Sequence, residues 1–195
     1  MRILYGILIV AIIPVLSCSA SKAVYKSQYA GQERGEIKSL SEADIAELKN
    51  GRGWGLAKAA ELNGVPGPAH LLEMKKEIGL NAEQIEKIER LYQTMRKQAI
   101  SLGFKLIELE RELNHHFANG TIGERRLHEQ LEKIAQVRKQ LRYVHLSTHL
   151  KTPSIITPEQ TALYNKLRGY SSDDPCANIP KGHNPEMWKR HHNCP

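Results

Sequence analysis

The feature that most constrains the fold is the long stretch 82–117, which contains no proline. Its apolar and semi-apolar residues recur at alternating intervals of three and four: Ile85, Ile88, Tyr92, Met95, Ala99, Leu102, Leu106, Leu109 and Leu113. This spacing is typical of an α-helix that packs lengthwise against another helix. At 1.5 Å per residue such a helix would be roughly 54 Å long, so it needs a partner of comparable length.

A second amphipathic stretch can supply that partner. Asn119-Gly120 ends the first helix, and Thr121 with Glu124 three positions later predicts a capping box that starts the next helix. The second apolar stripe ends before Pro153 and consists of Leu127, Leu131, Ile134, Val137, Leu141 and Val144. Two long helices joined by so short a connection predict an all-α fold built on a long antiparallel helical hairpin.

Capping and breaking residues predict short helices that flank the hairpin, at 41–50, 56–62, 68–79 and 157–169. Three large apolar residues, Leu91, Ile107 and Phe117, lie off the main seam of the first long helix. Either the short helices or a second copy of the chain must cover them. On this basis we expect a homodimer.

The N-terminal residues 1–20 resemble a signal peptide, with Arg2 before an apolar run and small residues after it. The run is shorter than the roughly 20 residues that span a bilayer, which indicates cleavage rather than a permanent anchor. Cys18 stands in a lipobox-like context, so cleavage would leave either a lipid-tethered or a soluble periplasmic protein. The polar segment 21–39 is predicted to be a flexible spacer.

The C-terminal tail 171–195 contains the other two cysteines, Cys176 and Cys194. In an oxidising compartment an even number of cysteines predicts a disulfide, and we expect these two to pair. Thiolate coordination of a metal ion by the same cysteines is the alternative, and the two states exclude each other. The tail also carries His183, His191 and His192, which could bind zinc or copper without the cysteines.

Two segments, 80–84 and 156–160, share one helix-start pattern: an apolar residue, an N-cap residue and a glutamine three positions later. The caps and glutamines are Asn81, Gln84, Thr157 and Gln160. The pair resembles the twice-repeated Leu-Thr-x-x-Gln signature of the Spy/CpxP family of periplasmic proteins, whose relatives include zinc-resistance-associated proteins and envelope heavy-metal sensors. Asn81 stands where the family prefers threonine and Ile156 where it prefers leucine, and both substitutions keep the physical role.

The likeness covers about residues 71–169 and implies a helical, cradle-shaped dimer. We expect the helical domain as a whole to span residues 40–170. Such a protein would bind unfolded or partner envelope proteins as an ATP-independent chaperone with no required cofactor, and this is the function we expect. A periplasmic zinc- or copper-binding resistance protein of the same fold is the alternative. Its candidate ligands are His145 and His149, which stand one helical turn apart, although His145 also continues an apolar stripe.

The formal net charge of +7 predicts attraction to acidic surfaces and acidic polypeptides. Nucleic acid is not expected as a partner, because the chain is predicted to be exported and carries no recognition motif. No nucleophile, base and oxyanion donor are placed together by the sequence pattern, so we do not expect an enzyme.

Overall fold

The computed structural model describes residues 25–170, 176, 179 and 181–194. In this part of the chain all regular secondary structure is helical, which confirms the all-α prediction. The signal peptide 1–20, the candidate lipidation site Cys18 and the first residues of the spacer lie outside the described residues. No helix of the described part is long and apolar enough to cross a membrane. The chain divides into two units after Glu33, and the described residues of the first unit, 25–33, are exposed and form no helix.

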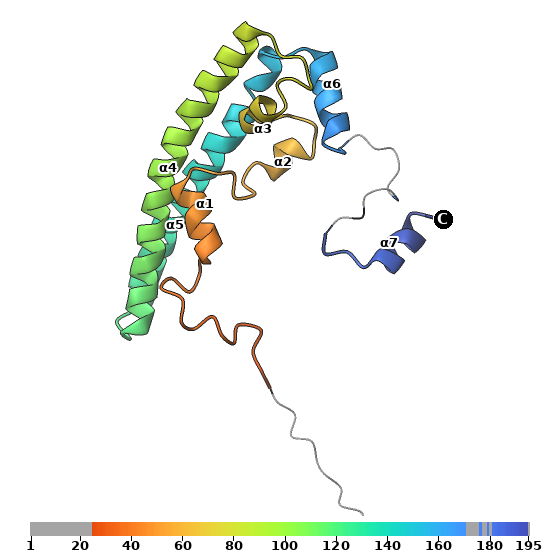
Figure 1. Cartoon of the computed structure of the whole chain (residues 1–195). Helices are drawn as coiled ribbons and strands as arrows, with labels where there is room; N and C mark the ends of the chain where they lie inside the picture. Colours follow the sequence, from red (N-terminus) through yellow and green to blue (C-terminus); the bar gives the residue numbers. More distant parts are fainter. Residues whose placement is uncertain (1–24, 171–175, 177–178, 180, 195) are drawn as a thin grey trace, which may run out of the picture. The chain divides into compact units, whose positions relative to one another are not determined.

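Two long helices, α4 (Ala82–Ala118) and α5 (Glu124–His149), lie side by side and run in opposite directions (Figure 1). The expected capping box at the start of α5 is absent, because Gly123 is the N-cap and no side chain caps the helix. The Thr121 hydroxyl lies 2.9 Å from Nδ1 of His116 instead. The hydroxyl therefore contacts the end of the preceding helix, and α5 begins two residues later than predicted, with Gly123 rather than Thr121 as its N-cap.

The shorter helices are α1 (Glu42–Lys49), α2 (Lys58–Glu61), α3 (Pro68–Glu73), the 3-10 turn η1 (Thr152–Ser154), α6 (Pro158–Leu167) and α7 (Pro185–His191). The helix predicted at 68–79 ends at Glu73, and turns lead from there to Gly79, where φ is 66°. The helix predicted at 56–62 is a single turn. Helix α7 was not predicted, because its seven residues show no clear apolar period.

One core cluster joins the segment around α1 to the middle of the two long helices. It consists of Ile37, Leu40, Leu48, Ala99, Leu106, Ile107, Ile134, Val137 and Leu141. Ile37 is only 1% exposed, so the end of the predicted spacer is part of the folded unit. Ile107 is covered by the chain itself and needs no second copy, whereas Phe117 remains 57% exposed.

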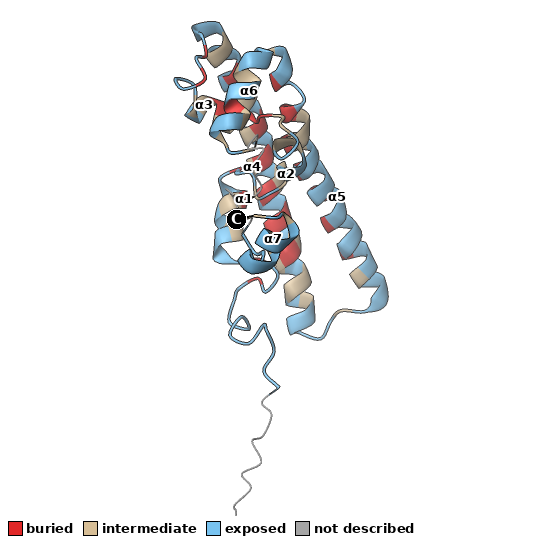
Figure 2. Cartoon of the chain, turned by 90° about the vertical axis from the view of Figure 1, so that its right-hand side faces the viewer, coloured by how far each residue is buried: buried red, intermediate tan, exposed pale blue. Residues whose placement is uncertain are grey.

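A second core cluster lies where α3 and α6 meet the start of α4, and it consists of Leu71, Ile78, Leu80, Ile88, Ile156 and Tyr164. Figure 2 shows the buried residues concentrated where the short helices meet the long ones. Helices α1 and α3 both pack against α4. The long pair therefore has one side that is covered by the chain's own short helices.

Gly103 allows the closest of these approaches. A Cβ atom at this position would lie 2.3 Å from the backbone oxygen of Leu48, the last buried residue of α1. Because real Cβ atoms do not approach backbone oxygen that closely, only glycine fits where α1 meets α4.

Candidate functional site

The two repeated capping motifs meet each other in space. Each forms a complete capping box, at the start of α4 and at the start of α6. The side-chain amide of Gln84 donates to Oε1 of Gln160 at 2.8 Å, and the amide of Gln160 donates back to Oε1 of Gln84 at 3.1 Å. The same two amides also donate to the backbone oxygens of Ile155 and Gly79. The two copies of the motif therefore bond to each other and join the starts of α4 and α6, which are far apart in sequence.

His145 and His149 both lie on the buried side of α5, where they are 3% and 5% exposed. Nε2 of His145 is buried and has no hydrogen-bond partner. Burial, and then the nearby His149, lower the pKa of His145 to about 4. At neutral pH His145 is therefore an uncharged imidazole with a buried polar atom left unpaired.

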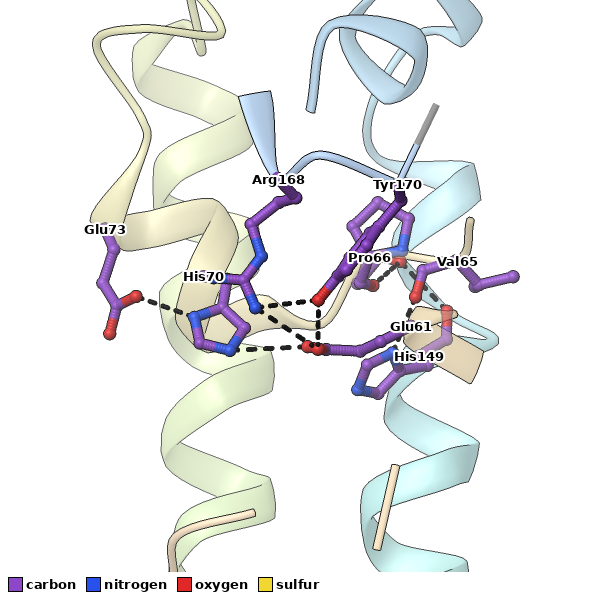
Figure 3. Close-up of polar contacts among 9 residues, drawn as sticks. Glu61, Val65, Pro66, His70, Glu73, His149, Arg168 and Tyr170 are labelled. Carbon is purple, nitrogen blue, oxygen red and sulfur yellow. Dashed lines mark hydrogen bonds and ion pairs between the residues drawn. The ribbon is translucent and has the colours of Figure 1, made fainter. Parts of the chain in front are cut away.

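His149 has a structural contact of its own (Figure 3). Its Nδ1 lies 2.8 Å from the backbone oxygen of Val65, and because a carbonyl only accepts, Nδ1–H is the donor. The Thr152 hydroxyl donates to the oxygen of Pro66 at 2.7 Å. A Cβ atom on Gly67 would lie 2.6 Å from Nε2 of His149. His149 thus fastens the segment before α3 to the end of α5.

Both histidines line a pocket of about 420 Å³ between α5, α4 and the segment that contains α2 and α3. His70 lies on the same pocket, with Nδ1 2.7 Å from Glu73 and Nε2 3.4 Å from Glu61. The sequence pattern does not indicate His70 as a site residue, because its contacts depend on how α3 packs against the long helices. No periodicity of the sequence could have paired it with α5.

Glu61 is the centre of the polar contacts beside this pocket (Figure 3). Its carboxylate lies 3.5 Å from the guanidinium of Arg168 and accepts a hydrogen bond from the Tyr170 hydroxyl at 3.2 Å. Arg168 in turn donates to the same hydroxyl at 2.9 Å. Glu61 is therefore engaged with α3 and with the end of α6. Among the described residues no three His, Cys, Asp or Glu side chains are grouped closely enough to hold a metal ion.

A larger groove of about 890 Å³ is lined only by residues of α4 and α5. Its lining consists of Thr94, Lys97, Gln98, Ser101, Leu102, Gln136, Lys139, Gln140, Tyr143 and Val144. Tyr143 is 70% exposed, whereas Leu102 and Val144 are partly buried against the core. Because no short helix contributes to its lining, the groove lies on a face of the long pair that the described residues leave bare.

In the tail, Cys176 and Cys194 form a disulfide with a Cα–Cα distance of 5.5 Å. The rings of His183 and His192 pack on Trp188, with centroids 4.9 and 4.2 Å from the indole. His191 lies beside His192, with the centroids 5.3 Å apart. Two of the three tail histidines therefore contact one indole ring, and the third lies beside one of those two.

Comparisons of this chain with models of known protein families, with curated proteins and with solved structures found no match.

Proposed function

We propose that this chain is an envelope protein of the Spy/CpxP type that holds apolar segments of unfolded or partner envelope proteins without ATP. Two features support the proposal: the paired capping motifs at the starts of α4 and α6, and the bare groove between α4 and α5. The groove is the observation that carries it. Periplasmic location and a homodimeric state belong to the same proposal.

The groove has the chemistry that weak binding of an unfolded chain requires. Apolar contact comes from Leu102, Val144 and the exposed ring of Tyr143. Lys97 and Lys139 add positive charge, and no acidic side chain belongs to the lining. Neither lysine forms an ion pair with another described residue. Positive charge speeds the encounter with acidic segments, and exposed apolar area then holds them.

The proposal is tested with an aggregation assay. Substoichiometric to equimolar purified protein is mixed with a chemically unfolded client protein, in the absence of ATP and with a metal chelator present. We expect light scattering from the client to be suppressed. A Tyr143→Ala, Lys97→Glu, Lys139→Glu triple variant should weaken client binding by roughly tenfold, which corresponds to about 1.4 kcal/mol.

The matched control is Phe104→Ala. Phe104 is an exposed apolar residue of α4 (48%) that does not line the groove, so its loss should leave suppression unchanged. If the wild-type protein suppresses no aggregation at an equimolar ratio, the chaperone function is wrong. If the control variant loses as much activity as the triple variant, binding does not occur in this groove.

Metal binding at the pocket lined by His145, His149 and His70 is the second candidate function. The buried, unpartnered Nε2 of His145 favours it, because a neutral imidazole nitrogen inside a pocket is a good ligand for zinc or copper. The Val65 contact of His149 is also the kind of outer contact that orients a ligating histidine. Because no group of three ligands is in place among the described residues, binding would require His70 or His149 to move.

Calorimetry with zinc and with copper tests this candidate. Tight binding that disappears in a His145→Ala, His149→Ala double variant would support it, with the exposed His128 changed to Ala as the control. Equal binding by the double variant and the wild type would exclude the pocket as the metal site.

A further inference from the structure

The disulfide loop of the tail combines thiols and imidazoles in a way that neither proposed function uses. Its two cysteines are 18 residues apart, and between them lie α7 and the three histidines His183, His191 and His192. Cysteine and histidine are the ligands that zinc prefers in small protein loops. The loop therefore holds five side chains that can bind zinc, one more than a tetrahedral site needs, and two of them are joined by the disulfide.

The backbone spacing of the two cysteines suits both states. A Cα–Cα distance of 5.5 Å is normal for a disulfide. Two thiolates on one tetrahedral zinc ion, each about 2.3 Å from the metal, have their sulfurs roughly 3.8 Å apart. The same backbone positions can satisfy that distance with small changes of the side-chain torsions. Opening the bond need not move the ends of the loop apart.

Two of the imidazoles contact the same aromatic ring. The centroids of the His183 and His192 rings lie 4.9 and 4.2 Å from the Trp188 ring. His192 is also only two residues from Cys194. In the oxidised loop these rings stack on the indole, and the described residues hold no ready group of three metal ligands.

We infer that the tail is a redox-controlled zinc site, in which Cys176, Cys194, His183 and His192 bind one zinc ion when the disulfide is reduced. The step needs a dithiol reductant. The dithiol is oxidised to its own disulfide and transfers two electrons and two protons, which break the Cys176–Cys194 bond and leave two thiols. Zinc binding then displaces those two protons, and the thiolates replace the disulfide as the link that closes the loop.

Zinc affinity of the oxidised and the reduced protein is measured by competition with a chromophoric chelator. We expect the reduced protein to bind one zinc ion at least roughly a hundredfold more tightly than the oxidised protein. Cobalt in place of zinc should give the near-ultraviolet charge-transfer band of a thiolate complex, and only after reduction. Cys176→Ser and Cys194→Ser should each abolish that band.

Two further variants identify the imidazole ligands and separate this site from the pocket on α5. His183→Ala with His192→Ala should lower the affinity of the reduced protein by roughly tenfold or more, and His128→Ala should not. In a Trp54→Phe background, zinc should change the fluorescence of the remaining Trp188 only in the reduced protein.

Three results would overturn the inference. Equal zinc affinity of the oxidised and reduced forms would show that the disulfide does not control binding. Retention of the tight site in Cys176→Ser would show that the thiolates are not ligands. Loss of the tight site in the His145→Ala, His149→Ala variant, with the tail intact, would place the metal in the α5 pocket instead.

Discussion

The two faces of the α4–α5 pair differ in what they do for the molecule. The covered face carries the buried apolar residues, the close approach at Gly103 and the paired glutamines, and it packs against α1, α3 and the start of α6. The bare face carries lysines, glutamines and an exposed tyrosine around a groove. The covered face therefore stabilises the fold, whereas the bare face is available for a partner.

The largest effect is expected from the buried imidazole on the covered face. In the unfolded chain a histidine has a pKa near 6.5, whereas burial lowers the pKa of His145 to about 4 in the folded chain. Between these two values the unfolded state binds a proton that the folded state does not. The contribution of neutral His145 to the free energy of unfolding is therefore complete above about pH 6.5. It falls by about 2 to 3 kcal/mol as the pH is lowered toward 4.

Urea titrations at pH 7 and pH 4.5 measure this loss for the wild type and for His145→Leu. Carboxylates contribute their own pH dependence to both proteins. The informative quantity is therefore the difference between the two proteins in the slope of the free energy of unfolding against pH. His128→Leu is the control, because His128 is exposed and should leave the slope unchanged. Equal slopes for all three proteins would mean that His145 is accessible to water and that the covered face of the α4–α5 pair does not exclude solvent.

The second effect concerns the approach of α1 to α4. A Gly103→Ala change should lower the free energy of unfolding by about 2 kcal/mol, because the new methyl group meets the backbone oxygen of Leu48 and the helices must separate. The higher helix propensity of alanine offsets only about 1 kcal/mol of this cost. Gly53→Ala is the matched control, since nothing lies within 4 Å of its Cβ position. A neutral Gly103→Ala variant would show that α1 is not held against α4.

The third effect is a coupling between the two capping motifs. Gln84→Ala and Gln160→Ala each remove a reciprocal amide contact and a helix cap. Because the two side chains bond each other, the double variant should lose about 1 kcal/mol less stability than the sum of the single losses. Thermal or urea unfolding of the four proteins completes the cycle. Strict additivity would show that the motifs cap their own helices without joining them.

The sequence predicted the parts of the fold that depend on a repeating period or on a local cap. The three-and-four spacing in α4 and the boxes at Asn81 and Thr157 are local features, and the structure contains all of them. A cap whose hydroxyl has another partner nearby was misjudged, as at Thr121. Contacts such as that of His70 with Glu61 depend on tertiary packing and left no signal in the sequence.

The stripe of α5 shows why polarity misled the prediction. The buried positions of this helix are 130, 134, 137, 141, 145, 148 and 149, which follow the helical period closely. The apolar side chain of Leu131 predicts a place in the seam, yet Leu131 is 48% exposed, and the buried position is Gln130. Where a buried position holds a polar residue, a search for apolar residues shifts to the neighbour. The burial of Ile37 was not predicted either. A single apolar residue in a polar segment has no periodic neighbours that would indicate a buried face.

The smallest effect on stability is expected on the bare face, and it is the one that separates binding from folding. Lys97 and Lys139 form no ion pair with the described residues, and the Tyr143 ring is 70% exposed. Reversing both charges and removing the ring should therefore change the free energy of unfolding by less than about 0.5 kcal/mol. Urea unfolding of the triple variant at pH 7 measures this. A loss of several kcal/mol would mean that the bare face also stabilises the fold, and any loss of client binding by this variant would then reflect unfolding rather than a groove that receives a partner.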